Sequence, residues 1–338
     1  GVVEVPAFYR HSRAESEGSR NFTSTTRDVR NLIVDLDRQG IDGLVIDLRG
    51  NGGGSLTEAT SLTGLFIDQG PVVQVKDALG KVEVEVDPEP GVVYGGPLAV
   101  LVDRNSASAS EIFAAAIQDY GRGVIIGEPT FGKGTVQTLI DLDRYVPGDA
   151  AELGRLRLTM AEFFRISGGS TQLKGVEPDI RFDFGIDIGD QGERSLENAL
   201  PWGQIRPAHY SRQQGVDFDW LRQRSAQRTA GDDGFRMLSA RGRLLGEIST
   251  QESVSLRESD RRAESERRDK ILKVERDRFL RARGLEPVDE DDDNLDEDAL
   301  EAQQAVIDRI QSEEAARILA DIVIERGDAN RPRAAMRD

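Results

Sequence analysis

Lys133 lies in the glycine-flanked stretch GEPTFGKGT, Gly127 to Thr135, which allows two kinds of chemistry. Two glycines five positions apart and a following lysine are part of a phosphate-binding loop, in which a Ser or Thr then binds Mg²⁺. Gly134 stands where that hydroxyl is needed. The next residues, TVQTLIDL, alternate like a strand, whereas a phosphate-binding loop must open a helix. A nucleotide-binding function is therefore disfavoured.

The second possibility is that Lys133 acts as a base. The chain has 44 basic residues, of which six are lysines, so arginine is its usual cation. Arginine cannot lose its proton near neutral pH, whereas a desolvated lysine can. A lysine between two apolar strands is suited to a general-base role. An ordinary surface-loop lysine is the alternative, and this segment alone does not decide between them.

Serines follow a predicted buried strand, residues 98–102, in the stretch NSASASEIFAAA. Ser106, Ser108 and Ser110 stand at the start of an amphipathic helix, where free amides and the helix dipole favour developing negative charge. A structural explanation is also available, because Ser108 and Glu111 have the spacing of a capping box. Three serines at alternate positions exceed what one cap requires.

Three consecutive glycines, Gly52 to Gly54, connect another predicted strand to a helix in DLRGNGGGSLTEA. Glycines tolerate positive φ and close backbone approach, so their amides can converge on an anion. A phosphate and a tetrahedral oxyanion both fit this pattern. A plain strand-to-helix turn would need fewer glycines.

The elements that position these groups are predicted from hydrophobic periodicity. Helical patterns cover residues 27–40, 55–66 and 110–121, and strands alternate with them, which indicates an α/β architecture. The predicted strands are GVVEV, GLVIDL, PVVQV, KVEVEV, PLAVLVD, GVIIGE and TVQTLIDL, all before residue 186.

After residue 186 the composition changes and strand patterns stop. One charged helix is predicted to end at Gly284 and one amphipathic helix, residues 301–327, to end at Gly327. The acidic stretch DEDDDNLDED between them lacks the central Gly and terminal Glu of a calcium-binding loop, so calcium binding is disfavoured there. The sequence thus predicts a core over residues 1–185 and a helical, charged domain over residues 186–338.

Composition excludes several function classes. The formal net charge of -17 disfavours nucleic-acid binding, and no apolar run is long enough to span a membrane. Cysteine is absent, and the two histidines, His11 and His209, lie among polar residues outside any ligand-spaced cluster. We therefore expect surface histidines, no metal or other cofactor, and no Ser-His-Asp triad.

Four of these stretches together resemble a known family. DLRGNGGG, NSASASEIFAAA, GEPTFGKGTVQ and GGSTQLKGVEPD look like the core of the C-terminal processing, or tail-specific, serine proteases. The resemblance covers residues 1–185 and implies a crotonase-like core related to the Clp protease subunit. ENALPW and the charged helices after it look like the C-terminal extension of the longer, periplasmic members from Gram-negative bacteria.

The resemblance assigns roles to particular residues. Ser108 matches the family's nucleophile, Lys133 its general base and Gln137 the residue that orients the lysine. Composition alone does not choose Ser108 over Ser106 or Ser110. Lys133 and Gln137 are four positions apart, so on a strand they would share a face.

The family's oxyanion hole matches two further positions. Ala109, through its backbone N–H, is one; a glycine of the run 52–54 is the other, with Gly54 expected first and Gly53 next. The implied function is a serine endopeptidase that uses a Ser-Lys dyad to cleave proteins near their C-terminal tails in the periplasm.

The resemblance also carries expectations about partners. Protein substrates are implied, and an adaptor lipoprotein is an expected partner of the tail. Family members carry a PDZ domain ahead of most of the core, which this chain lacks, so we expect weak or no proteolysis. The alternative is a non-catalytic or dormant scaffold that binds an adaptor through its helical tail.

Overall fold

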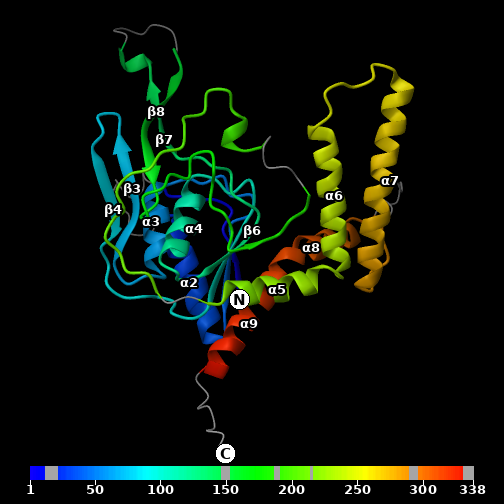
Figure 1. Ribbon diagram of the computed structural model, residues 1–338, viewed down its shortest axis with the longest axis horizontal. Coiled ribbons are helices and arrows are strands. Elements are labelled where there is room, and N and C mark those ends of the chain that lie inside the picture. The colour runs from blue at the N-terminus through cyan, green and yellow to red at the C-terminus, as the bar shows by residue number, and fades with distance from the viewer. Residues whose placement is uncertain (12–21, 146–152, 186–190, 214–215, 289–295, 330–338) are drawn as a thin grey trace, which may run out of the picture.

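The first sheet holds the apolar strands at the centre of the protein (Figure 1). The computed structural model describes residues 1–11, 22–145, 153–185, 191–213, 216–288 and 296–329. All five strands of this sheet run parallel, in the order β1-β2-β5-β6-β9. They are β1 (Val2–Glu4), β2 (Leu44–Asp47), β5 (Leu98–Val102), β6 (Val124–Gly127) and β9 (Ile180–Arg181).

Side chains on both faces of this sheet are buried, which explains the continuous apolar runs in the sequence. Ile46 and Val100 face one hydrophobic cluster, while Val45 and Leu101 face a second. Each face is therefore covered by helices.

The second sheet is antiparallel, in the order β4-β3-β8-β7. Its strands are β3 (Gly70–Asp77), β4 (Val82–Asp87), β7 (Thr135–Asp141) and β8 (Arg155–Phe164). Strand β8 was not predicted from the sequence, although Leu156, Leu158 and Met160 alternate as in a strand. The seven strands predicted from the sequence are all confirmed.

Helices α2 (Thr25–Arg38), α3 (Leu56–Gly64) and α4 (Ala109–Asp119) contribute to the first hydrophobic cluster, on one side of the parallel sheet. Each begins at a serine: Ser24, Ser55 and Ser108 are the N-cap residues. Single helical turns occur at Asp143–Tyr145 and Glu193–Ser195. The three predicted helices of the core are confirmed.

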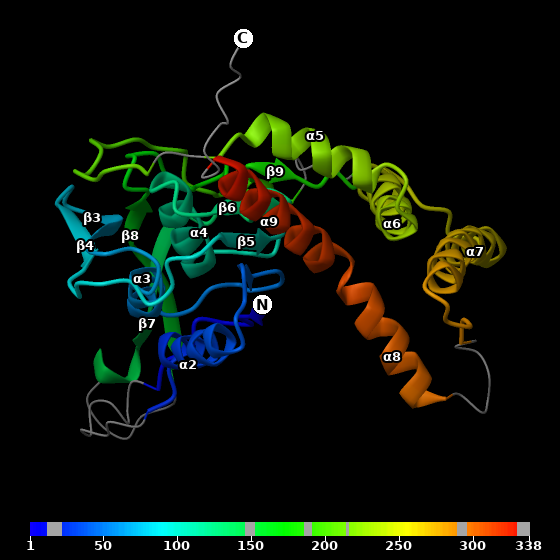
Figure 2. The same ribbon diagram turned by 90° about the horizontal axis from the view of Figure 1, so that it is seen from below.

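The other face is covered by helices of the tail, mainly α9 (Ile310–Ala329), with α5 (Phe218–Thr229) beside β9 (Figure 2). The remaining helices, α6 (Asp233–Ser249), α7 (Glu258–Ala282) and α8 (Glu297–Asp308), extend away from the sheet (Figures 1 and 2). Ile318, Leu319 and Ile322 of α9 belong to the same buried cluster as the sheet residues of its second face. Sequence regions on both sides of residue 185 therefore build one hydrophobic core.

A predicted single helix over residues 301–327 is wrong. The structure has two helices there, with a break after Asp308, and α9 continues through Gly327. The break allows Ile310 to enter the second cluster and α9 to lie along the sheet, while α8 extends beyond it (Figure 2). Glycine lowers helix propensity by about 1 kcal/mol, which packing of the rest of α9 can override.

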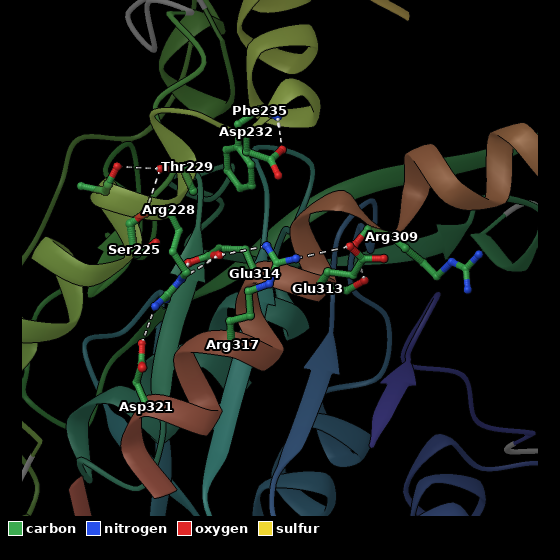
Figure 3. Close-up of polar contacts among 12 residues, drawn as sticks. Ser225, Arg228, Thr229, Asp232, Phe235, Arg309, Glu313, Glu314, Arg317 and Asp321 are labelled. Carbon is green, nitrogen blue, oxygen red and sulfur yellow. Dashed lines mark hydrogen bonds and ion pairs between the residues drawn. The ribbon is translucent and has the colours of Figure 1, made fainter. Parts of the chain in front are cut away.

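Ion pairs fasten α5 to α9 (Figure 3). Glu314 is fully buried and accepts hydrogen bonds from Arg228, whose other nitrogen lies 2.6 Å from Asp321. Arg317 also lies 3.6 Å from Glu314. Two helices that are distant in sequence are thereby joined across the second face of the sheet.

The mixed-sheet α/β core and the helical region after it are thus confirmed. After β9 no strand occurs among the described residues, and α7 ends next to Gly284, which has φ 76°. The acidic loop 289–295 lies outside the described residues. None of the described helices is long and apolar enough to cross a membrane.

Candidate active site

The structure distinguishes the three serines at the start of α4. Ser106 and Ser110 are fully buried, and their hydroxyls donate to the carbonyl oxygens of Leu48 (2.8 Å) and Asn51 (2.9 Å). Both serines therefore join the start of α4 to the glycine-rich loop after β2. Ser108 is only half-buried. Of the three hydroxyls, that of Ser108 is the one left open to a substrate.

Ser108 has an unusual backbone conformation. Its φ of 58° and ψ of -111° lie in the region that L residues rarely adopt. The preceding amide, Ala107 N, donates to Asn51 O (3.0 Å), so neighbouring contacts hold this conformation. Strained backbone of this kind occurs most often at functional sites.

Glu111 is the hub of the site. Its carboxylate is fully buried, and Oε2 accepts hydrogen bonds from the backbone N–H groups of Ser108 (2.8 Å) and Lys133 (2.9 Å). Oε1 accepts from Thr130 Oγ1 (2.6 Å) and Gly132 N (2.8 Å). One carboxylate therefore fixes the start of α4 and the β6–β7 loop relative to each other.

Burial determines the charge state of this carboxylate. Loss of solvation raises the pKa of Glu111 to about 7, against the hydrogen bonds from Thr130, Ser108, Gly132 and Lys133, which lower it. No cation forms an ion pair with Glu111 among the described residues. Its protonation therefore changes near neutral pH.

Lys133 lies in the loop between β6 and β7, where Glu111 holds its N–H and Thr171 Oγ1 donates to its carbonyl oxygen (3.3 Å). Its side chain is half-buried. Its Nζ has no hydrogen bond or ion pair with any residue that the structure describes, Ser108 included. The amine is thus not neutralised by a carboxylate.

Gln137 lies within β7, whereas Lys133 lies in the loop before it, because the strand begins only at Thr135. At the register shift between Val136 and Gln137 the extra residue is Met160 of β8, so side chains along β7 itself continue to alternate. The common face of Lys133 and Gln137 therefore stays a prediction. Gln137 is exposed and has no hydrogen bond to Lys133 in the described part of the chain.

The glycine run passes directly beside Ser108. A Cβ on Gly53 would lie 2.9 Å from Ser108 Cβ and 3.0 Å from Ala109 N, so only glycine permits this approach. The N–H of Gly53 already donates to Asn51 Oδ1 (2.8 Å). Gly54, by contrast, lies opposite Phe8 in a parallel bridge whose hydrogen bonds are made by Gly53 O and Ser55 N. The N–H of Gly54 itself therefore points away from Phe8.

Two N–H groups near Ser108 are consequently available. Among the described residues, neither Gly54 N–H nor Ala109 N–H has an acceptor. Ala109 is the first residue of α4, where the helix leaves its N–H groups unpaired. Free backbone donors beside a hydroxyl can stabilise an oxyanion.

The strand that follows GEPTFGKGT rules out the phosphate-binding arrangement, as expected, because β7 and not a helix follows Lys133. His11 and His209 are exposed, which confirms them as surface residues. The described residues contain no cluster of three or more His, Asp or Glu side chains arranged to hold a metal ion.

Sequence comparison identifies the family. The profile of peptidase family S41 matches residues 1–182, which is more than half of the chain, and the C-terminal domain of tail-specific protease matches residues 186–324. The chain belongs to peptidase family S41. The residues matched by the S41 profile include the loops that carry Ser108 and Lys133.

Individual relatives agree with this assignment. The chain is 40% identical to the tail-specific protease of Haemophilus influenzae over 333 residues, covering 97% of this S41 chain and 45% of the relative. It is 34% identical to the chloroplastic C-terminal processing peptidase of Tetradesmus obliquus over 161 residues, 48% of this chain and 33% of that one. The S41 chain therefore spans less than half the length of these relatives.

Among solved structures, the photosystem II D1 C-terminal processing protease is similar to the S41 chain, with 32% identity and a TM-score of 0.45. The similarity covers 54% of this chain and 42% of that protein.

Sequence reasoning missed part of this S41 site. Glu111 was recognised only as a capping partner of Ser108, and Asn51 and Thr130 were not singled out. The Ser-x-x-Glu spacing gave a signal for the contact to Ser108. No local pattern reveals the contact between Glu111 and Lys133, because the two lie 22 residues apart in sequence.

Proposed function

We propose that this chain contains the catalytic machinery of a serine endopeptidase with Ser108 as nucleophile and Lys133 as general base. Ser108 Oγ attacks a peptide carbonyl carbon while Lys133 Nζ takes the hydroxyl proton. The tetrahedral oxyanion accepts hydrogen bonds from Ala109 N–H and Gly54 N–H. When the carbon–nitrogen bond breaks, Lys133 returns the proton to the leaving amine.

Hydrolysis of the acyl-enzyme completes the cycle. Lys133 removes a proton from water, the hydroxide attacks the ester carbon, and Ser108 leaves with that proton. A lysine accepts a proton only in its neutral form, and exclusion of water favours that form. Phe131 and Val136, beside the lysine loop, are the proposed apolar walls.

One observation carries the proposal: the same oxygen of Glu111 accepts the N–H of Ser108 and the N–H of Lys133. The two residues are thereby held on facing loops, with the hydroxyl half-buried and the amine free of ion pairs. Glu111 is in this mechanism a positioning residue, since it acts through the backbone of the two catalytic residues.

The remaining predicted site residues have narrower roles. Gln137 is the proposed orienting partner of Lys133, and because its side chain is exposed, this role requires a rearrangement at the start of β7 when substrate binds. Gly53 provides space for Ser108. Since its N–H is already bonded to Asn51, we favour Gly54 as the second oxyanion donor.

The names of the relatives support the substrate class. We propose protein substrates cleaved near or from their C-terminal tails, in the periplasm, with an adaptor lipoprotein as a partner of the tail. Because the chain spans less than half of those relatives, cleavage of an unfolded protein by this chain alone is expected to be slow.

A fluorophosphonate probe tests the proposal, since it reacts only with an activated serine. Labelling is expected at Ser108, located by mass spectrometry, and is expected to fall at least about a thousandfold in Ser108→Ala and Lys133→Ala. Ser110→Ala, which changes a neighbouring serine, should still be labelled. Equal labelling of Lys133→Ala, or labelling at another serine, would contradict the dyad.

The alternative, a non-catalytic scaffold, gives a different result in the same assay. A scaffold would show no labelling of Ser108 at saturating probe concentration while remaining folded. That outcome would leave the helical tail as the functional part of the chain.

A further inference from the structure

A cleft lies between β9 and helices α5 and α6. Its volume is about 650 Å³, and its walls are residues 178–183 on one side and parts of α5 and α6 on the other. This volume is within the range of ligand pockets, about 300–1,000 Å³. The elements that form it appear together in Figure 2, and Ser225, Thr229 and Phe235 of its helical wall are labelled in Figure 3.

One wall of the cleft is an unpaired strand edge. β9 is the last strand of the parallel sheet and pairs only with β6. Phe182 N donates to Gly127 O (2.8 Å), so the backbone groups of Phe182 point toward β6. Those of Ile180, two positions earlier, point the same way. The N–H and C=O of Arg181 must therefore point outward, because backbone groups alternate along a strand.

A contact with α5 confirms this outward direction. Asp179 has the same alternation as Arg181, and its carbonyl oxygen accepts a hydrogen bond from Arg222 Nε (2.8 Å) across the cleft. The side chain of Arg222 thus binds the outer edge of the β9 segment at Asp179. At Arg181, two positions further along, no described residue pairs with the outward backbone groups.

The cleft is also basic. Its lining contains four arginines, at positions 181, 222, 236 and 243, and two aspartates, Asp179 and Asp183. The carboxylate of Asp179 is turned away toward β6 and α4, where it accepts from Ile125 N (2.8 Å) and Gln118 Nε2 (3.0 Å). Asp183 accepts from Gly185 N (2.9 Å). Arg222 is paired with Asp219 of its own helix (2.7 Å). The lining itself has two more arginines than aspartates, in a chain of net charge -17.

Arg243 of α6 has a guanidinium that is available to a ligand. Like Arg181, it is exposed and has no side-chain hydrogen bond or ion pair with any described residue. Its Cγ would lie 3.4 Å from a Cβ on Gly185, which places its side chain beside the end of the β9 segment. Arg236, about two turns earlier on α6, pairs with Asp233 (2.8 Å).

We propose that this cleft binds an extended, acidic peptide segment. The peptide backbone pairs with the outer edge of β9 at Arg181, and its carboxylates pair with Arg243 and Arg236. Strand addition supplies affinity through main-chain hydrogen bonds, and guanidinium groups recognise carboxylates through their paired donors. The proposal is independent of the Ser-Lys dyad, because the cleft shares no residue with the proposed catalytic groups.

Fluorescence anisotropy tests the proposal with the Ser108→Ala chain, so that cleavage cannot remove the probe. The probe is a fluorescein-labelled peptide of alternating Glu and Val, and the comparison peptide has Gln at each Glu position. Binding is expected to be at least about tenfold tighter for the Glu peptide and to weaken as salt rises. Equal binding of the two peptides would overturn the proposal.

Matched variants locate the site. Arg243→Glu is expected to weaken binding at least about tenfold, whereas Arg241→Glu, with the same charge change on α6 but outside the cleft, should leave it unchanged. Equal losses in both variants would show general charge attraction and contradict the site. Thermal melting checks that both variants remain folded.

Two further probes test the strand pairing. Methylation of the peptide nitrogens that would face β9 should abolish binding, because the main-chain donors are removed. A single-stranded RNA of similar charge should bind at least about tenfold more weakly than the peptide. Unchanged binding of the methylated peptide, or RNA binding as tight as that of the peptide, would overturn the proposal.

Discussion

Two fully buried glutamates, one in the core and one in the tail, are satisfied in different ways. Glu111 has four hydrogen bonds from neutral donors, three of them backbone N–H groups, and no cation. Glu314 is paired with Arg228 at 2.8 Å and has Arg317 at 3.6 Å. The first carboxylate holds two loops in place, and the second holds two helices together (Figure 3).

The difference has a chemical consequence. A buried carboxylate without a cation keeps a raised pKa, because hydrogen bonds from neutral groups only partly replace water. A carboxylate between guanidinium groups is neutralised locally, and its contribution depends on both partners remaining. The core site is thus sensitive to pH, whereas the tail is sensitive to the loss of a side chain.

The largest expected effect is on the tail. Arg228→Ala leaves Glu314 and Asp321, both buried, without their shared partner and is expected to lower the free energy of unfolding by about 3–5 kcal/mol. Urea unfolding measures this. Arg262→Ala removes an exposed pair within α7 and should cost about 0–1 kcal/mol. Similar small losses for both variants would show that the α5–α9 contact contributes little.

The pH dependence of stability tests the other half of the comparison. The pKa of Glu111 in the folded state, about 7, lies above its ordinary value of 4.5, so between these pH values the folded state holds more protons than the unfolded state. Stability from this group is present below pH 4.5 and is lost, by about 3 kcal/mol, as pH rises through about 7.

Glu111→Gln removes this titration. The difference in unfolding free energy between the unchanged chain and Glu111→Gln should fall as pH rises from about 4 to about 8. Urea unfolding across that range measures it, and the other carboxylates cancel in the difference. A difference that is constant, or that grows with pH, would show that Glu111 is not raised in pKa.

A smaller effect is expected on the reactivity of Ser108. In Glu111→Gln an amide NH₂ must face backbone donors, so the rate of fluorophosphonate labelling should fall at least about tenfold, which corresponds to roughly 1.4 kcal/mol. Glu58→Gln is the control, because Glu58 is also a fully buried carboxylate in the first turn of a helix, bonded instead to Ser24, Thr26 and Arg10. If both variants lose labelling equally, the effect is general destabilisation and not positioning.

The smallest effect concerns the serines beside Ser108. Ser106→Ala and Ser110→Ala each remove one hydrogen bond to the glycine-rich loop and should cost about 1 kcal/mol while Ser108 remains reactive. Thermal melting and probe labelling measure the two quantities. Loss of labelling without loss of stability in either variant would mean that the hydroxyls were assigned to the wrong roles.

Much of the fold could be predicted from the sequence. Strands such as β2 and β5 are continuous apolar runs because both faces of their sheet are covered, and such runs are visible locally. Strand β8 was missed, since Leu156, Leu158 and Met160 remain 42–47% exposed and have no place in a core pattern. The break between α8 and α9 was missed because it depends on where Ile310 packs.

The candidate site was predicted in its residues but not in its geometry. The spacing of Lys133 and Gln137 predicted a shared face on a strand, but Lys133 lies in the loop before β7, which begins at Thr135. Gly53 and Gly54 are equivalent in sequence. Contacts with Asn51 and Phe8 make them different, because one contact occupies the N–H of Gly53 and the other turns that of Gly54 outward.

The sequence by itself determined most elements of the core, the helix start near Ser108, the glycine run and the family pattern, since all of these are local in the chain. Only the tertiary structure decided which serine hydroxyl remains free and that Glu111 joins the serine loop to the lysine loop. Both depend on hydrogen bonds between segments separated along the chain, as in the contact of Ser110 with Asn51, 59 residues away.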